Sequence, residues 1–599
     1  MPLKTPCLVA VALAAAALSL PLHAADRKKT APEAAPAAAD PYAEVQPATE
    51  SLDLDMYQRI RDEGLNHSHV MEFATALADG IGPRLTGSPN LKKANEWTRD
   101  TLTRIGLENA HLEDWGEFGM GWEQLNTWAR MVEPDTAVLI LQASPWSPST
   151  SGPVTGDVVY VAMQSERDFD QYKGKLAGKI VLFGAMRPVP PVDKPLFERN
   201  TDKDLDDIAE YPVSSSDAAD PGAELEAAMH ARMERRQFLE KVAQFFAEEK
   251  VAAVIEPSRD GANGGGSGGT IFDDNGTFFG RTPYLAEHAT RVPVAVAAIE
   301  SYGRLYRLVQ QHVPVSVEID IETKVTDEHA HGYNTIAEIP GTDPKLKDQV
   351  VMLGGHLDSW IAGTGATDNG AGVVAAMEAV RILEALGVKP RRTIRIALWT
   401  GEEQGLFGSQ GYVKQHFGSA RLSTAPDQAM LPEYLRRADG PLEVKPEQKL
   451  ISAYFNVDNG SGKIRGIYTQ GNGAVAPIFA QWMAPLKDLD VTTITERNTG
   501  GTDHLGFDAA GIPGFQFIQD DLDYESRSHH SNEDVYERLQ PADLRQIATV
   551  EAIFVYNAAQ RDQMMPRKPL PQPEQEKKRR EPIEGIFPGA VAEPEPNKP

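Results

Sequence analysis

The sequence predicts an α/β protein in which a mixed, mainly parallel sheet is flanked by helices and interrupted by an inserted β-rich domain. Strand and helix patterns alternate after residue 333, an order typical of sheets covered by helices on both faces. Short β runs dominate residues 145–323, which indicates a separate small domain. The length of 599 residues also exceeds what one hydrophobic core supports.

The elements of the main domain can be assigned in chain order. A helix is predicted over 91–105, and strand patterns appear over 126–141. Beyond the insert, periodicity predicts strands at 349–353, 393–399, 450–457, 466–469 and 514–518, and helices at 372–386, 474–486 and 542–563. We therefore expect a main domain made of 51–144 and 324–563, with the insert at 145–323.

The two ends of the chain differ from the rest in composition. Lys4 precedes an apolar, Ala-rich run at 8–20 and small residues near Ala24, which predicts a secretory signal peptide at 1–24. Residues 25–50 are Ala/Pro-rich and residues 564–599 are Pro- and charge-rich, so we expect a disordered linker and a disordered tail. The expected location is periplasmic or secreted.

Charge and cysteine content exclude several classes of protein. The formal net charge is -27 with a pI near 5.0, which argues against nucleic acid or an anionic membrane as a partner. After the signal peptide, no run approaches the roughly 18 apolar residues of a membrane span, so no membrane anchor is expected. The single cysteine, Cys7, lies in the signal peptide, so disulfides and cysteine-based sites are excluded.

Acidic residues and a histidine gather where predicted strands end. His356 and Asp358 follow the apolar run 350–353, Asp368 lies in a Gly-rich loop, and the pair Glu402–Glu403 follows strand 393–399. Open α/β sheets place their sites at such strand ends. Oxygen and imidazole donors from separate loops suit a divalent transition metal, most often zinc.

Further polar residues follow later strands. Asp458 follows strand 450–457, His504 precedes an apolar stretch, and His529 and His530 lie in a polar loop. Each alone is explained as well by a turn or a surface position, and their joint occurrence at strand ends is what indicates a site. The glycine-dense stretch 261–269 lacks the spacing of a phosphate-binding loop, and we expect it to be a flexible loop.

These segments resemble the family of co-catalytic zinc exopeptidases that includes bacterial leucyl aminopeptidases and the glutamate carboxypeptidases. The resemblance covers about 52–563, and the insert resembles a protease-associated domain. The histidine pair and the preceding segment look closest to the plasma glutamate carboxypeptidase branch. The motifs that carry it are GGHLDS, ATDNGAG, GEEQGLFGS, NVDNG, GTDHLGFDAAGIPGFQF and HSNED.

The resemblance implies a role for each matching residue. Asp368 would bridge two zinc ions, and Glu402 would be the general base. His356 and Asp458 would complete one metal position, and Glu403 and His530 the other. Asp358 would orient the His356 ring from outside the ligand set. His529 would contact the substrate.

The implied activity is hydrolysis of a terminal peptide bond of a short peptide or dipeptide. Two zinc ions, for which Co²⁺ or Mn²⁺ can substitute, activate a water, and a free carboxylate moves its proton. We favour an aminopeptidase, with a carboxypeptidase or dipeptidase as the alternative and an inactive receptor or scaffold as the alternative from another class. The plasma-type relatives suggest a homodimer.

Which end of the peptide is read depends on charged residues near the metals. A free amine requires an acid, and a free carboxylate requires arginine or backbone donors. Candidate substrate contacts besides His529 are Asp503, His504, Arg497 and Arg527.

Overall fold

A computed structural model describes residues 46–210, 235, 237–274, 282–425, 428, 436 and 438–570. The predicted signal peptide, most of the predicted linker and the tail beyond residue 570 lie outside these ranges. No helix among the described residues is long and apolar enough to cross a membrane.

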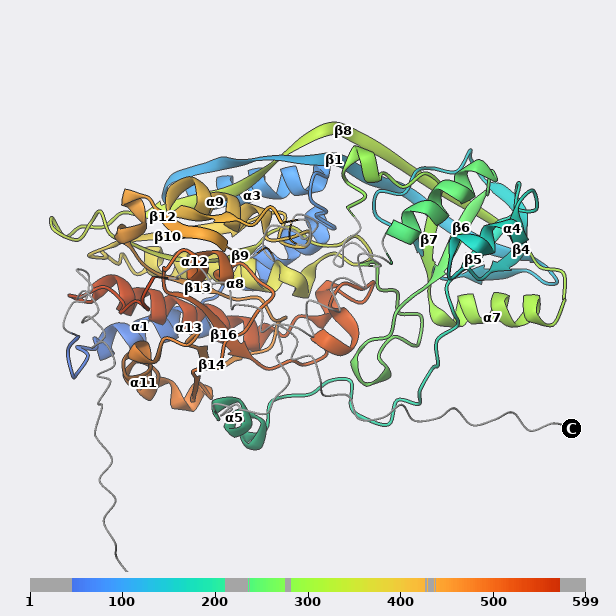
Figure 1. The fold of residues 1–599 in the computed structure, drawn as a ribbon. Coiled ribbons are helices and arrows are strands. Elements are labelled where there is room, and N and C mark those ends of the chain that lie inside the picture. The colour runs from blue at the N-terminus through green and yellow to red at the C-terminus, as the bar shows by residue number, and fades with distance from the viewer. Residues whose placement is uncertain are drawn as a thin grey trace, which may run out of the picture. The chain divides into compact units, whose positions relative to one another are not determined.

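Fourteen of the described strands form one large mixed sheet, which confirms the predicted fold class (Figure 1), and β11 and β12 pair separately. Its centre is parallel, since β9 pairs in parallel with both β10 and β13, and β13 pairs in parallel with β16. Strand order across the main domain is β15 (Thr493–Thr495), β14 (Ile464–Tyr468), β16 (Gly514–Gln519), β13 (Ile451–Asn456), β9 (Val350–His356), β10 (Thr393–Trp399) and β8 (Ser316–Ile339).

Helices cover both faces of this sheet because successive strand residues point to opposite sides. Val351 and Leu353 of β9 pack with α8 (Ala371–Ala385) and α13 (Pro541–Gln560) in one hydrophobic core. Met352 packs on the other face with α9 (Phe407–His416) and α12 (His504–Ala509). The first core also contains residues of α1 (Leu54–Asn66), α2 (Val70–Ala74), α3 (Pro89–Arg104) and α11 (Ala476–Met483).

A long antiparallel pair of strands links the main domain to the insert. β1 (Glu108–Glu133) pairs with β8 over most of its length (Figure 1). The sheet then continues through the insert as β4 (Val154–Val161), β5 (Ile180–Phe183), β6 (Ala253–Pro257), β7 (Val294–Ala297) and β3 (Leu141–Ala143). Ala129, Met131 and Leu139 belong to the insert's hydrophobic core, so the composition change at residue 145 falls inside this core rather than at its edge.

The remaining described elements are short or lie at the periphery. The insert also has a helix that is described over 237–248. The shorter elements are β2 (Ala137–Leu139), α4 (Phe169–Tyr172), α5 (Asp202–Ala209), α7 (Ile299–Gln310), β11 (Gly418–Leu422) and β12 (Ala438–Val444).

Ordered structure extends into both segments that were predicted to be disordered. Glu50, predicted to lie in the linker, is buried and forms a bidentate ion pair with Arg561 at 2.8 and 2.9 Å. In the predicted tail, Met565 is buried and Lys568 lies 2.6 Å from Asp508. Composition alone did not reveal that these segments find charged and apolar partners on the main domain.

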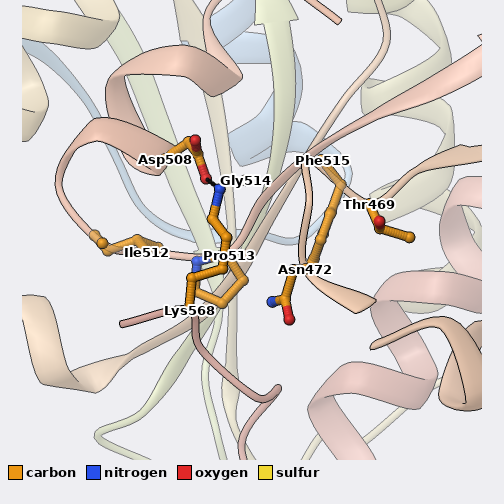
Figure 2. A pocket seen from close by; sticks show the side chains of 9 residues that line it. Thr469, Asn472, Asp508, Ile512, Pro513, Gly514, Phe515 and Lys568 are labelled. Atoms are coloured by element: carbon orange, nitrogen blue, oxygen red, sulfur yellow. Dashed lines mark ion pairs between the residues drawn. The ribbon is translucent and has the colours of Figure 1, made fainter. Parts of the chain in front are cut away.

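A small cavity lies beside Lys568 at the edge of the sheet where β16 begins (Figure 2). Its volume is about 10 Å³, enough for a single water. Pro513 and Gly514 line it at the amino end of β16, so it lies at the opposite end of the parallel strands from the predicted site.

Candidate metal centre

Side chains from separate segments converge at the carboxyl edge of the sheet. His356 ends β9, Asp368 lies in the turn before α8, Glu402 and Glu403 follow β10, and Asp458 follows β13. These strands are parallel neighbours, so their carboxyl ends meet at one edge. The loop after β16 brings His530 to the same place.

Asp368 lies between the two histidines. Its Oδ1 is 3.3 Å from His356 Nε2, and its Oδ2 is 3.3 Å from His530 Nε2. Asp458 Oδ1 lies 3.2 Å from His356 Nε2, and Glu403 Oε2 lies 2.9 Å from His530 Nε2. We call His356 with Asp458 the first metal position and His530 with Glu403 the second. Asp368 faces both.

The donor set fits divalent metal ions. Donor atoms of His356, Asp368 and Glu403 lie within 4.8 Å of one another. Glu403 Oε1 is buried and has no hydrogen-bond partner among the described residues, and a buried carboxylate oxygen is costly unless a donor or cation compensates it. Carboxylates and imidazoles without thiolates are ligands that zinc accepts.

The pKa shifts of the buried histidines and carboxylates also show that positive charge stabilises the centre. Burial lowers the pKa of His356, but Asp458 and Glu402 raise it overall well above 6.5. Burial also lowers the pKa of His530, but Glu403 raises it overall well above 6.5. Burial and Asp368 together raise the pKa of Glu403 to about 8. Protons and metal ions therefore compete for the same compensating role.

Glu402 is placed differently from its neighbour Glu403. Its Oε2 lies 3.9 Å from His356 Nε2, whereas Glu403 faces His530. Burial raises the pKa of Glu402 well above 4.5. A carboxyl group with a raised pKa beside two metal positions, and not needed by either, suits proton transfer.

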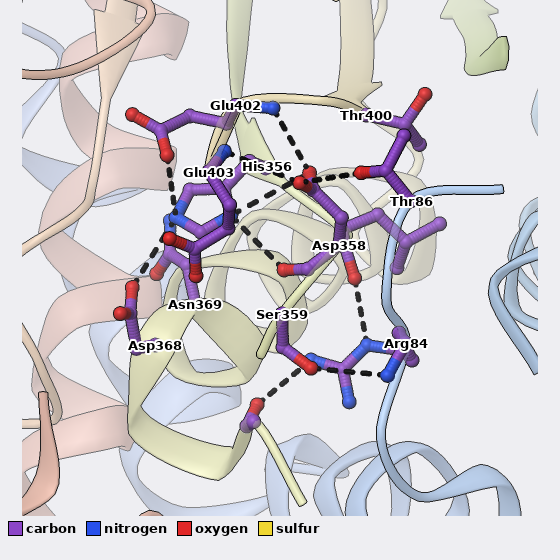
Figure 3. A network of polar contacts seen from close by, with 12 residues as sticks. Arg84, Thr86, His356, Asp358, Ser359, Asp368, Asn369, Thr400, Glu402 and Glu403 are labelled. Carbon is purple, nitrogen blue, oxygen red and sulfur yellow. Dashed lines mark hydrogen bonds and ion pairs between the residues drawn. The ribbon is translucent and has the colours of Figure 1, made fainter. Parts of the chain in front are cut away.

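Asp358 differs from the prediction in the atom that contacts His356. The nitrogen Nδ1 of His356 lies 3.1 Å from the backbone oxygen of Asp358 and 3.7 Å from its carboxylate. The carboxylate instead accepts hydrogen bonds from Thr86 Oγ1 at 3.0 Å and from the amides of Glu402 and Glu403 at 3.3 Å (Figure 3). Asp358 thus fixes the ring through its main chain and the Glu402–Glu403 turn through its side chain.

Two further residues hold the loops of the centre. Arg84 is fully buried and donates to the carbonyl oxygens of Leu357 and Gly365, each at 2.7 Å (Figure 3). Asp534 accepts from the amide and hydroxyl of Thr367 at 2.5 and 2.7 Å. No sequence pattern marked Arg84, because its partners are backbone carbonyls, and Asp534 was recognisable only as part of the HSNED motif.

Among the predicted substrate contacts, His529 and Asp503 lie near the centre. His529 Nε2 is 3.8 Å from Asp368 Oδ2, and burial with the neighbouring His530 lowers its pKa to about 3. Burial raises the pKa of Asp503 to about 7, and its carboxylate in turn raises the pKa of Glu402.

The other predicted contacts are engaged elsewhere. His504 lies 2.7 Å from Gln470 Nε2 in a buried pocket. Arg497 donates to the backbone oxygen of Glu210 at 2.8 Å, and Arg527 pairs with Glu533 at 2.9 Å.

The glycine-dense stretch of the insert packs closely on the second metal position, contrary to the flexible loop predicted. A Cβ at Gly261 or Gly265 would lie 2.1 or 1.9 Å from the backbone oxygen of Ser526. Further along the chain, Asp274 Oδ2 lies 3.0 Å from His530 Nδ1. These glycines therefore permit a close backbone approach, a role that composition did not distinguish from flexibility.

The fold and the donor set of the centre are of the kind found in metal-dependent hydrolases of the α/β class. Residues 334–555 match peptidase family M28. Carboxypeptidase Q of Mus musculus is 28% identical over 82% of this chain and 86% of its own length. Residues 334–555 thus carry a match to peptidase family M28, and this match confirms the resemblance read from the motifs.

Two further comparisons cover different extents. A probable leucine aminopeptidase 2 of Aspergillus fumigatus is 29% identical over 40% of this chain and 42% of its own length. The crystal structure of a peptidase M28 precursor from Shewanella amazonensis has a TM-score of 0.56 at 22% identity, covering 86% of this chain and 98% of that one. This likeness supports the fold.

Proposed function

We propose that this chain is an exported metallo-exopeptidase that hydrolyses a terminal peptide bond of short peptides or dipeptides, with two zinc ions and Glu402 as general base. The observation that carries the proposal is the geometry of Asp368, which presents one carboxylate oxygen to each of two histidines at 3.3 Å. Each histidine has a further carboxylate of its own, as two adjacent metal positions require.

The residues divide the chemical work. His356, Asp458 and Asp368 would hold one ion, and His530 and Glu403 would hold the other with Asp368. The bound ions would supply Lewis acidity to the attacking water and the scissile carbonyl. Glu402 accepts a proton from the water as its oxygen bonds to the carbonyl carbon. It then donates the proton to the amine nitrogen as the carbon–nitrogen bond breaks.

We favour the free amine as the recognised end. The centre is rich in carboxylates, with Asp503 near Glu402, and an ammonium group requires an acid of this kind. Arg497 and Arg527, the arginines considered for a carboxylate, bond elsewhere. The second candidate is a carboxypeptidase or dipeptidase, which the extent of the match to carboxypeptidase Q favours. Export and a homodimer remain parts of the proposal drawn from the sequence and the family.

The test compares a leucine dipeptide blocked at its amino terminus with one amidated at its carboxyl terminus, on zinc-loaded protein. Glu402→Gln serves as the blank. Cleavage of the amidated peptide alone supports the aminopeptidase, and cleavage of the blocked peptide alone supports the carboxypeptidase. Cleavage of only the unblocked dipeptide indicates a dipeptidase. A chain that binds no zinc and cleaves none of them would favour the scaffold.

A further inference from the structure

We propose that Asp274 is a positioning residue for His530, so that the insert completes the second metal position. This inference rests on the proposed metal centre. Asp274 lies outside the segment that matches the family, 334–555, whereas His356, Asp368, Glu403, Asp458 and His530 all lie within it.

The contact of Asp274 with His530 determines which way each ring nitrogen of His530 faces. Asp274 Oδ2 lies 3.0 Å from His530 Nδ1, while His530 Nε2 faces Glu403 at 2.9 Å and Asp368 at 3.3 Å. A carboxylate that accepts the Nδ1 proton leaves the lone pair on Nε2, on the side of the metal position. The same contact limits rotation of the ring.

Asp274 is itself held in place. Arg259 Nε lies 2.9 and 3.2 Å from the two oxygens of Asp274. The Arg259 guanidinium stacks 3.9 Å above the Phe272 ring, and its Nη2 donates to the backbone oxygen of His529 at 3.3 Å. Asp274 therefore lies between an arginine of its own loop and the histidine that it orients.

The loop is docked on the segment that carries His530. Ile271 and Asn532 exchange hydrogen bonds, from the Ile271 amide to Asn532 Oδ1 at 2.7 Å and from the Asn532 amide to the Ile271 oxygen at 2.9 Å. The Asp273 amide donates to the backbone oxygen of His530 at 3.1 Å. The carboxylate of Asp273 accepts the amide of Ala362 at 2.7 Å. Several bonds made by the residues just before Asp274 thus fix its position.

Among the described residues, the histidine of the first metal position is oriented from within its own loop. His356 Nδ1 is held by the backbone oxygen of Asp358 at 3.1 Å, two residues along the same loop. Loss of Asp274 should therefore weaken the second position selectively.

The experiment measures zinc stoichiometry and affinity by competition with a chromophoric chelator for wild type, Asp274→Ala and Asp274→Asn. We expect Asp274→Ala to weaken one of two zinc sites by about 10–100-fold and to leave the other unchanged. Asp274→Asn should be intermediate, because its amide oxygen can still accept the Nδ1 proton. Asp260→Asn is the control, since Asp260 accepts amides within the same loop and should leave both sites unchanged.

A double-mutant comparison separates positioning from general destabilisation. In a His530→Ala background, Asp274→Ala should have no further effect on zinc affinity, since the ring it orients is gone. Equal weakening of both sites by Asp274→Ala, or unchanged affinity at both, would overturn the inference. If Asp274→Ala does not fold, Asp274→Asn carries the same test. Wild type that binds no zinc would instead overturn the proposed metal centre.

Discussion

The two metal positions have the same donor types but different supports. His356 is oriented from within its own loop, by the backbone oxygen of Asp358. His530 is oriented across the fold, by Asp274 of the insert. The carboxylate partners, Asp458 and Glu403, both follow central strands of the main domain.

The histidine of the first position is supported by a residue near it in sequence, and the histidine of the second by a residue far away in sequence. A backbone carbonyl two residues away is fixed once strand β9 and its loop form. Asp274 reaches His530 only after the insert has folded and its glycine-dense loop has docked near Ser526. The second position is therefore the one that changes in the insert should disturb, and the following changes test that contrast.

The largest effect is expected from Glu402→Gln. The neutral amide cannot take up the proton of the attacking water, so kcat should fall by about 10²–10⁴-fold. Because Glu402 faces His356 at 3.9 Å without being needed by either metal position, both zinc ions should stay bound. Steady-state kinetics with zinc analysis checks this. Loss of one zinc together with the activity would show that Glu402 is a ligand instead.

A smaller and selective effect is expected from Gly265→Ala. The new Cβ would meet the Ser526 oxygen at 1.9 Å, so the loop must move away from the segment that carries His530. Zinc affinity should fall about tenfold at one site, the lower end of the range for outer-shell changes. Gly500→Ala is the matched control, since nothing lies within 4 Å of the corresponding Cβ. Equal chelator titrations for the two variants would contradict the docking argument.

The smallest effect on the metal centre is expected from Glu551→Gln, which concerns only the stability of the main domain. Glu551 in α13 is fully buried, and both its carboxyl oxygens have no hydrogen-bond partner among the described residues. Burial raises its pKa well above 4.5. The folded state therefore holds the proton more tightly than the unfolded state, and this stabilisation is lost as pH rises above about 4.5.

Glu551→Gln should remove this loss of stability at higher pH, because the neutral amide does not ionise. Between pH 4.5 and the raised pKa of folded Glu551, the unfolding free energy of wild type should fall relative to that of the variant. The expected fall is about 1.4 kcal/mol for each pH unit. Urea unfolding at several pH values measures the difference, and Glu537→Gln, at an exposed glutamate, is the control. Zinc affinity at both positions should not change. Parallel pH profiles of wild type and Glu551→Gln would contradict the expectation.

Periodicity was sufficient for most of the main domain. The strand predicted over 393–399 coincides with β10, and the helix predicted over 372–386 lies within one residue of α8 at each end. Both segments have strong apolar patterns that tertiary packing reinforces. The short strand β15 and the helix α12 were missed, since segments of three and six residues carry too little periodicity to be recognised.

The sequence by itself determined the fold class, the family and the set of acidic and histidine residues at strand ends. These features depend on local pattern and on motifs that each lie within a few residues. Only the tertiary structure decided that Asp358 uses its main chain, that His504 and Arg497 point elsewhere, and that Asp274 meets His530. These contacts join residues whose separation along the chain carries no periodic signal, and only the folded backbone brings them within hydrogen-bonding distance.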